Sequence, residues 1–454
     1  LTDKTTHISL CGGRAIGKCS PATARIYTYP YGYITINQLL RQMSKSNTKS
    51  FIVYALNHKK KELVQRRAVL FENFHKPVWK ITTASGFEFE GTPNHPVLTV
   101  TGYENMEDLQ EGEYVAVARH LPHHSVQKKF SWAELRFMGY IIGRDMMRVE
   151  KPLPLRFQRQ IAEFHQLAKE FNAVFIKDRQ GGYFLKRKKG PFPHYFTQLM
   201  RDLKYDSFVL NKIQFLPHDL RAECLEHIQV FLESFFSMWG EFTEVTVKTQ
   251  HISHRVMLEI QELLLRFGIE SEVRKPEAGS EKSMLRLRDY EAYYRFFETF
   301  DIPGVSVTGL KPPGPLDESF LRYDQIIKKE YTGTHRTYGL QVQHDENYIS
   351  DNIFVHNSVI LEDKLVFEAI NAETEFPDTK EQVLATANAS QMTPLFDHFV
   401  NRFNGPVLRG FLSKVNRSSG TIDFNLRDGI NYRMFTRIAG KTGESNMIGL
   451  HCPR

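Results

Sequence analysis

A glycine-rich loop near the start of this chain lacks one residue that its pattern requires. Gly12, Gly13, Gly17 and Lys18 have the spacing of a phosphate-binding loop, GxxxxGK(S/T). Such a loop needs glycines whose backbone N–H groups converge on phosphates, a lysine, and then a hydroxyl that binds Mg²⁺. Cys19 follows the lysine here, and a thiol is a poor ligand for a hard cation. The loop is therefore incomplete as written.

Composition narrows the class of protein. With 454 residues, the chain favours two to four domains. Hydrophobic residues at 41% and charged residues at 24% argue against an integral membrane protein. The four cysteines show no CxxC spacing, which disfavours a disulfide framework and a structural zinc site. We expect a soluble protein without a membrane partner, in the cytoplasm of a bacterium or a phage-infected cell.

The pattern of residue types changes several times along the chain. From Cys19 to about Arg119, short β-rich runs alternate with turn residues, which predicts an all-β unit. Between residues 131 and 303 a helical run followed by an apolar strand occurs twice, at 167–176 and again at 263–273, which predicts an α+β domain with a duplicated half. A β-rich pattern returns at 337–355.

Three short blocks, at the two outer ends of the β-rich parts and within the first of them, have a specific resemblance to a known family. The β-rich pattern ends in His356-Asn357-Ser358, the block Thr92-Pro93-Asn94-His95 lies within the first β-rich part, and Cys19 begins it. Together they resemble the splice junctions and the TxxH block of an intein. The resemblance implies an all-β, horseshoe-shaped Hint domain that excises itself. Gly339 and Glu346 depart from the family pattern, at positions where an Asp and a His are usual.

The resemblance also implies a role for each junction residue. The Cys19 thiol attacks the Lys18 carbonyl, and Ser358 then takes the acyl group from the thioester. Asn357 cyclises through its side-chain amide to cut the chain. No cofactor and no metal are expected for splicing. The expected catalytic residues are Cys19, Thr92, His95, His356, Asn357 and Ser358.

Removing residues 19–357 would repair the loop. It joins Lys18 to Ser358 and yields GGRAIGKS, a complete GxxxxGK(S/T) followed by a helical run. The flanks then resemble the α/β P-loop ATPase domain of phage terminase large subunits, with a helicase-type ATPase as the alternative host. Mg-ATP is the cofactor expected after splicing, bound by Gly12, Gly13, Gly17, Lys18 and Ser358.

The central insertion has a resemblance of its own. Two runs, 137–145 and 231–240, look like the paired helices of a LAGLIDADG homing endonuclease, in which each helix delivers one acid to Mg²⁺. Arg144 and Trp239 stand at the two acid positions, so we expect a degenerate domain. Mg²⁺ would be needed only if the endonuclease is active, with Asp145 or Glu233 as replacement ligands.

Basic charge is concentrated in this insertion. Residues 151–220 hold 13 Lys and Arg against 6 Asp and Glu. Such a surplus favours contact with double-stranded DNA, although a solvated loop face is the alternative. The densest run consists of Lys186, Arg187, Lys188 and Lys189.

The whole chain is thus predicted to be a host protein, an intein and an endonuclease-like domain nested in one another. Two other classes remain open: a DNA-binding or DNA-cleaving protein with vestigial splicing, and a hedgehog-like autoprocessing protein, which the His356-Asn357-Ser358 end disfavours. The predicted divisions are 1–18 and 358–454 for the host flanks, 19–125 and 326–357 for the splicing domain, and 126–325 for the endonuclease-like domain.

Overall fold

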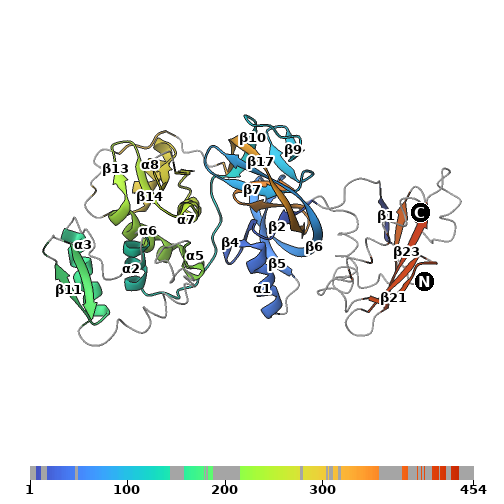
Figure 1. Ribbon diagram of the computed structural model, residues 1–454, viewed down its shortest axis with the longest axis horizontal. Helices are drawn as coiled ribbons and strands as arrows, with labels where there is room; N and C mark the ends of the chain where they lie inside the picture. The colour runs from blue at the N-terminus through green and yellow to red at the C-terminus, as the bar shows by residue number, and fades with distance from the viewer. Residues whose placement is uncertain are drawn as a thin grey trace.

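The computed structural model consists of three groups of elements (Figure 1). A β-rich unit lies between an α+β unit and a smaller flanking sheet, and the flanking sheet contains strands from both ends of the chain. The structure describes residues 7–11, 18–46, 50–143, 158–177, 179, 182–187, 215–276, 280–302, 305, 310–314, 319–356, 381–386, 396, 400, 403, 412–418, 420–425 and 431–438.

The β-rich unit is a twelve-stranded sheet. Its two longest strands, β6 (Glu62–Thr83) and β17 (Leu321–Val342), pair antiparallel with three register shifts. Such irregularities bend and twist strands, so a long ribbon can curl around a core. The β-rich expectation is confirmed, and β17 begins slightly before the expected division at residue 326. The other strands are β2 (Ser20–Pro21), β3 (Arg25–Tyr29), β4 (Gly32–Thr35), β5 (Ser50–Asn57), β7 (Glu88–Gly91), β8 (Pro96–Thr99), β9 (Gly102–Asn105), β10 (Tyr114–Ala118), β18 (Asn347–Ser350) and β19 (Ile353–His356).

One helix, α1 (Ile36–Ser46), interrupts the strands that were expected throughout this part. A capping box starts it, because the Gln38 N–H donates to Thr35 Oγ1 at 3.2 Å and Gln38 Oε1 accepts from the Thr35 N–H at 3.0 Å. Ile36 and Leu39 are buried on its inner side. The all-β expectation was therefore wrong at this segment.

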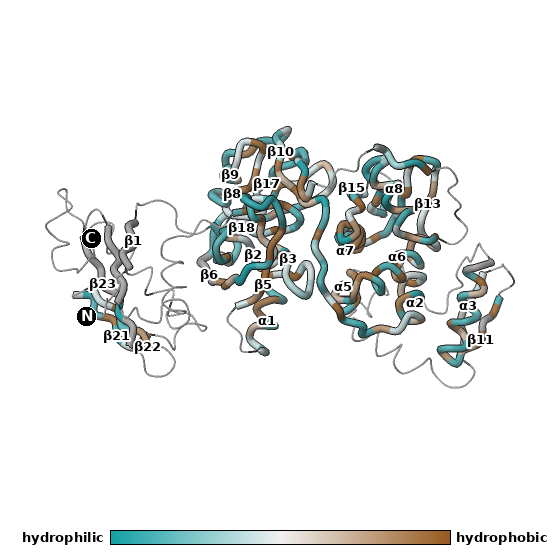
Figure 2. The backbone as a smooth tube through the Cα atoms, turned by 180° about the vertical axis from the view of Figure 1, so that it is seen from behind, coloured by the Kyte–Doolittle hydropathy of each residue, from teal (hydrophilic) through white to brown (hydrophobic). Residues whose placement is uncertain are grey.

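The α+β unit repeats a helix-then-strand order. Helix α3 precedes β11, and α7 precedes β15, as the two similar runs of sequence predicted. Figure 2 shows the hydrophobic character of α7, which is buried along almost its whole length. The elements are α2 (Trp132–Ile142), α3 (Gln158–Glu170), β11 (Ala173–Lys177), β12 (Tyr183–Arg187), α5 (His218–Arg221), α6 (Leu225–Trp239), β13 (Glu241–Phe242), β14 (Val247–His251), α7 (His254–Leu265), β15 (Ser271–Arg274), β16 (Ser283–Leu287) and α8 (Tyr290–Thr299).

Helices α2 and α6 pack closely against each other at a small residue. A Cβ added to Gly139 would lie 2.7 Å from both the Phe231 carbonyl oxygen and Ser234 Cβ, closer than real Cβ atoms approach other groups. Glycine at this position therefore sets the spacing of the two helices.

The α+β unit docks onto the β-rich unit through α7 and the strand that follows it. Leu265 belongs to the apolar core of the β-rich unit, and its carbonyl accepts from the Leu121 N–H at 3.0 Å. The Val273 N–H donates to the Ser85 carbonyl at 3.0 Å. The two units thus share both apolar and backbone contacts.

The flanking sheet combines residues from before and after the long insertion. β1 (His7–Cys11) pairs in parallel with β20 (Glu381–Thr386), which pairs in parallel with β23 (Asn431–Ile438). β22 (Thr421–Asn425) and β21 (Leu412–Asn416) extend the sheet antiparallel. Strands far apart in sequence therefore lie side by side.

Candidate functional site

The backbone at Cys19 is held by Thr92. The Cys19 N–H donates to Thr92 Oγ1 at 3.1 Å, and the Thr92 N–H donates to the Cys19 carbonyl at 2.9 Å. The Thr92 hydroxyl donates in turn to Asn94 Oδ1 at 3.0 Å, which orients its lone pairs toward the Cys19 N–H. Because this nitrogen belongs to the peptide bond between Lys18 and Cys19, Thr92 fixes the orientation of that bond.

His95 contacts the same Cys19 carbonyl as the Thr92 N–H does. Its Nδ1 is 3.2 Å from the Cys19 carbonyl oxygen, and since a carbonyl only accepts, Nδ1 carries the proton. Nε2 is then the unprotonated nitrogen, and it is buried without a hydrogen-bond partner among the described residues. Burial lowers the pKa of His95 to about 4, and although the Cys19 hydrogen bond opposes this, the charges of Lys18 and His356 add to it. The ring is therefore neutral near pH 7, with a lone pair available on Nε2.

His356 ends β19 close to the same place. β19 pairs with β8, which follows His95 directly, and Val355 lies opposite Val97. The His356 ring packs edge-on against Tyr103 with 4.7 Å between centroids. Burial, and then the positive charges of Lys18 and His58, lower the pKa of His356 to about 4. The end of the β-rich unit is thus brought to its beginning.

An acid, Glu346, lies beside His356. Its Oε2 lies 4.0 Å from His356 Nε2. The residue occupies a left-handed backbone conformation with φ 54°, which favours glycine, so the turn that carries it is held by its surroundings. Sequence reasoning noted Glu346 only as a departure from a family pattern. It missed Tyr103 altogether, because no local signal points from β9 to β19.

Several expected site residues lie outside the described residues. These are Gly12, Gly13 and Gly17 of the loop, Asn357 and Ser358 of the second junction, Arg144 and Asp145 of the first LAGLIDADG-like run, and Lys188 and Lys189 of the basic run. Lys186 and Arg187 lie in β12, and only the backbone of these two residues is described. Gly339 lies within β17, paired with Phe71 of β6.

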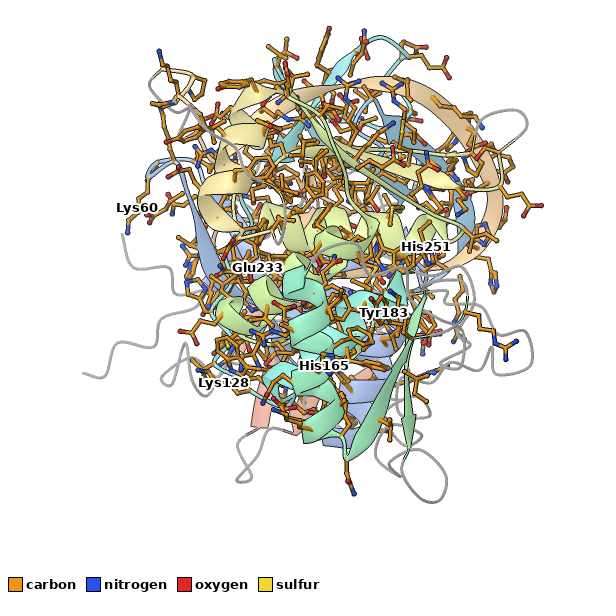
Figure 3. All side chains as sticks on the ribbon, turned by 90° about the vertical axis from the view of Figure 1, so that its left-hand side faces the viewer. Lys60, Lys128, His165, Tyr183, Glu233 and His251 are labelled. Carbon is orange, nitrogen blue, oxygen red and sulfur yellow. The ribbon has the colours of Figure 1, made fainter. Side chains whose placement is uncertain are left out.

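Trp239 stands at the second expected acid position, and its indole ring lies against the end of α2. Trp239 Nε1 donates to the Tyr140 carbonyl at 3.1 Å, and a Cβ at Gly143 would overlap the indole. His251, labelled in Figure 3, lies 3.1 Å through Nε2 from the Ile142 carbonyl. Two side chains therefore bind the carbonyls at the end of α2.

Glu233 lies elsewhere on α6 (Figure 3). It accepts from Gln229 Nε2 at 3.0 Å and from the Asp301 N–H at 3.2 Å. Within the described part of the chain, no group of three His, Cys, Asp or Glu side chains is arranged to hold a metal ion.

The family model for the intein splicing domain matches residues 34–357. The chain belongs to the intein splicing domain family. The function of this family is protein splicing. Among the described helices, none is long and apolar enough to cross a membrane.

Relatives of this intein include replicative helicases and solved inteins. A replicative DNA helicase DnaB of a Nostoc species is 22% identical over 440 residues, covering 74% of this chain and 49% of the helicase. The DnaB helicase of Rhodothermus marinus is 35% identical over 96 residues, covering 21% of this chain and 10% of the helicase. The chain therefore spans about half the length of the Nostoc relative. A crystal structure of a DnaB intein from Synechocystis matches at 11% identity with a TM-score of 0.29, covering 76% of this chain and 100% of that one.

Proposed function

We propose that the chain excises residues 19–357 and joins Lys18 to Ser358. The observation that carries this proposal is the hydrogen bond from the Cys19 N–H to Thr92 Oγ1 at 3.1 Å, beside the buried His95. A peptide bond that must break is thereby held in one orientation next to a neutral imidazole.

The first step breaks the bond between Lys18 and Cys19. The Cys19 sulfur attacks the Lys18 carbonyl carbon, a C–S bond forms, and the C–N bond breaks. The thiol proton ends on the departing nitrogen, which becomes an amine. His95 can carry that proton, because its neutral ring first accepts it and then donates it, a role worth ~10²–10⁴-fold in rate. Thr92 keeps the nitrogen in place meanwhile.

The later steps use the second junction. The Ser358 hydroxyl attacks the Lys18 thioester carbonyl and releases the Cys19 thiol. The Asn357 side-chain nitrogen then attacks its own backbone carbonyl, which frees the Ser358 amine and leaves a cyclic imide. His356 donates a hydrogen bond to that carbonyl. An acyl shift from the Ser358 oxygen to its nitrogen completes the new peptide bond, and no cofactor enters.

Intact mass measured on the purified precursor over time tests this proposal. We expect an excised product of residues 19–357 and a ligated product of the two flanks. Cys19→Ala should stop cleavage at the first junction and Asn357→Ala at the second, whereas Cys224→Ala, at a buried cysteine of the inserted unit, should splice normally. A folded precursor that stays unchanged, or equal products from the two blocked variants, would contradict the proposal.

We further propose that splicing restores a P-loop ATPase. The parallel pairing of β1 with β20 supports it, because a phosphate-binding loop follows a strand of a parallel sheet. The sequence favours a terminase-like host, and a helicase-type host is the alternative, since the Nostoc relative is a helicase by name. Mg-ATP should bind the full-length ligated host and not the Cys19→Ala, Asn357→Ala precursor. Equal affinity in both would refute the junction as the phosphate site, and ATP-driven strand separation would identify the helicase alternative.

For the inserted α+β unit we propose DNA binding without cleavage. The indole of Trp239 against Gly143 leaves an aromatic ring where an acid would bind Mg²⁺. Binding to double-stranded DNA should weaken steeply as salt rises, because basic side chains contact phosphates. Mg²⁺-dependent double-strand cleavage of the intein-free host gene would overturn the proposal and support an active endonuclease.

A further inference from the structure

The turn that carries Glu346 is fixed from both sides. Asp345 forms an ion pair with Arg66 at 2.6 Å. The Asn347 side chain accepts from the Leu56 N–H at 2.6 Å and donates to the Leu56 carbonyl at 2.9 Å. A non-glycine residue kept in a left-handed conformation by such anchors often serves a functional site. The Glu346 carboxylate is therefore presented in a defined position.

The Glu346 carboxylate lies beside the residue that precedes the second splice junction. Asn347 lies opposite His356 in the β18–β19 hairpin, and the Glu346 carboxylate is 4.0 Å from the His356 ring. Lys18 precedes Cys19, whose backbone is fixed on Thr92, and its side chain is half-buried. Burial lowers the pKa of Lys18, and the charge of Glu346 opposes that effect. His95, whose Nδ1 lies 3.2 Å from the Cys19 carbonyl oxygen, packs against Tyr348 of the same hairpin with 6.4 Å between ring centroids, so the hairpin that carries Glu346 adjoins the residue that follows Lys18.

We propose that Glu346 holds the Lys18 ammonium at the splice junction and makes this intein specific for a cationic residue before Cys19. Glu346 is a positioning residue, since it contacts neither of the atoms that react. This inference rests on the splicing reaction proposed above. It also explains why an acid replaces the histidine usual at this position, because lysine is the residue that a phosphate-binding loop supplies there.

The test uses the full precursor carrying Asn357→Ala, so that only the first junction reacts, and measures cleavage induced by dithiothreitol. Lys18→Arg should react like the parent, and Lys18→Met or Glu346→Gln should react roughly fivefold more slowly. Lys18→Glu and Glu346→Lys, which place like charges together, should each slow the reaction by about tenfold or more. The double variant Lys18→Glu, Glu346→Lys should recover to within about threefold of the parent.

Different results would contradict the role of Glu346 and the proposed splicing reaction. Recovery in the double variant cannot arise from a merely structural role, because each single change would then add its own damage. Glu272→Gln removes an acid from the α+β unit and should leave the rate unchanged. If the parent reacts and Lys18→Met reacts equally fast, or the double variant is slower than both single variants, the specificity inference fails alone. If the parent itself forms no thioester, the proposed splicing fails instead.

Discussion

Gly32 and Arg266 touch across the boundary between the β-rich unit and the inserted unit, so closely that a Cβ at Gly32 would overlap the Arg266 guanidinium. Arg266 is buried, and its Nη2 lies 2.6 Å from Glu262 Oε1. Arg221 Nη1 donates to the Tyr33 carbonyl at 2.7 Å nearby. A buried charged cluster thus joins the insertion to the splicing domain.

Removing one charge of this cluster should destabilise the precursor strongly. Arg266→Met leaves Glu262 buried with one partner fewer, and breaking a buried pair in this way costs about 3–5 kcal/mol. Denaturant unfolding of the splicing-blocked precursor measures the loss. Arg274→Met breaks an exposed pair with Glu272 and should cost less than about 1 kcal/mol. Similar losses in both variants would mean that the cluster does not join the two units.

Thr92→Val should slow the first splicing step by about 10- to 100-fold, because the scissile N–H loses its acceptor and its orientation. Thr92→Ser keeps the hydroxyl and should retain most of the rate. Thiol-induced cleavage in the Asn357→Ala background measures this step. Thr249→Val, at a buried threonine of the inserted unit, serves as the matched control. A Thr92→Val rate equal to that of the control would remove Thr92 from the mechanism.

Lowering the pH should destabilise the folded intein already in the range above that in which carboxylates titrate. Burial lowers the pKa of His95 and of His356 to about 4, whereas an unfolded histidine titrates near 6.5. The unfolded chain therefore binds protons first, so stability is fully present above about pH 6.5 and is lost as the pH falls toward 4. The pKa values of His123 and His218 are also lowered to about 4, chiefly by burial.

The free energy of unfolding between pH 7 and 4 checks this expectation. His95→Gln should reduce the loss by roughly 3 kcal/mol, since one of the titrating groups is gone. His335→Gln, at an exposed histidine of β17, serves as the matched control. An unchanged slope in His95→Gln would show that this ring is already charged in the folded protein.

Gly139→Ala should destabilise the paired helices of the insertion. The added methyl meets the Phe231 carbonyl and Ser234 at 2.7 Å, and overpacking of this kind costs about 1–3 kcal/mol. Adding Ser234→Gly should restore part of the loss, because one of the two colliding groups is removed. Thermal unfolding measures both, and a double variant no better than the single one would argue against this contact.

The sequence predicted the elements whose signals are local. The Thr92–His95 block and the second β-rich pattern, which ends before His356, located both ends of the site. Helix α1 was missed although its Thr35-x-x-Gln38 capping box was readable, because the surrounding β pattern dominated the interpretation. The place of Leu265 in the core of the other unit, and of Glu346 beside His356, depends on contacts between residues far apart in sequence. Local periodicity holds no information on such contacts.

The parallel pairing of β1 with β20 has a consequence for a reaction that stops half-way. Their backbone hydrogen bonds join the two flanks without any covalent link through the insertion. A chain nicked at either junction should therefore remain one particle under native conditions and separate only in denaturant. The severed ends stay at a high effective concentration, as tethered partners do. An interrupted reaction leaves the host broken in its covalent chain yet assembled in its fold.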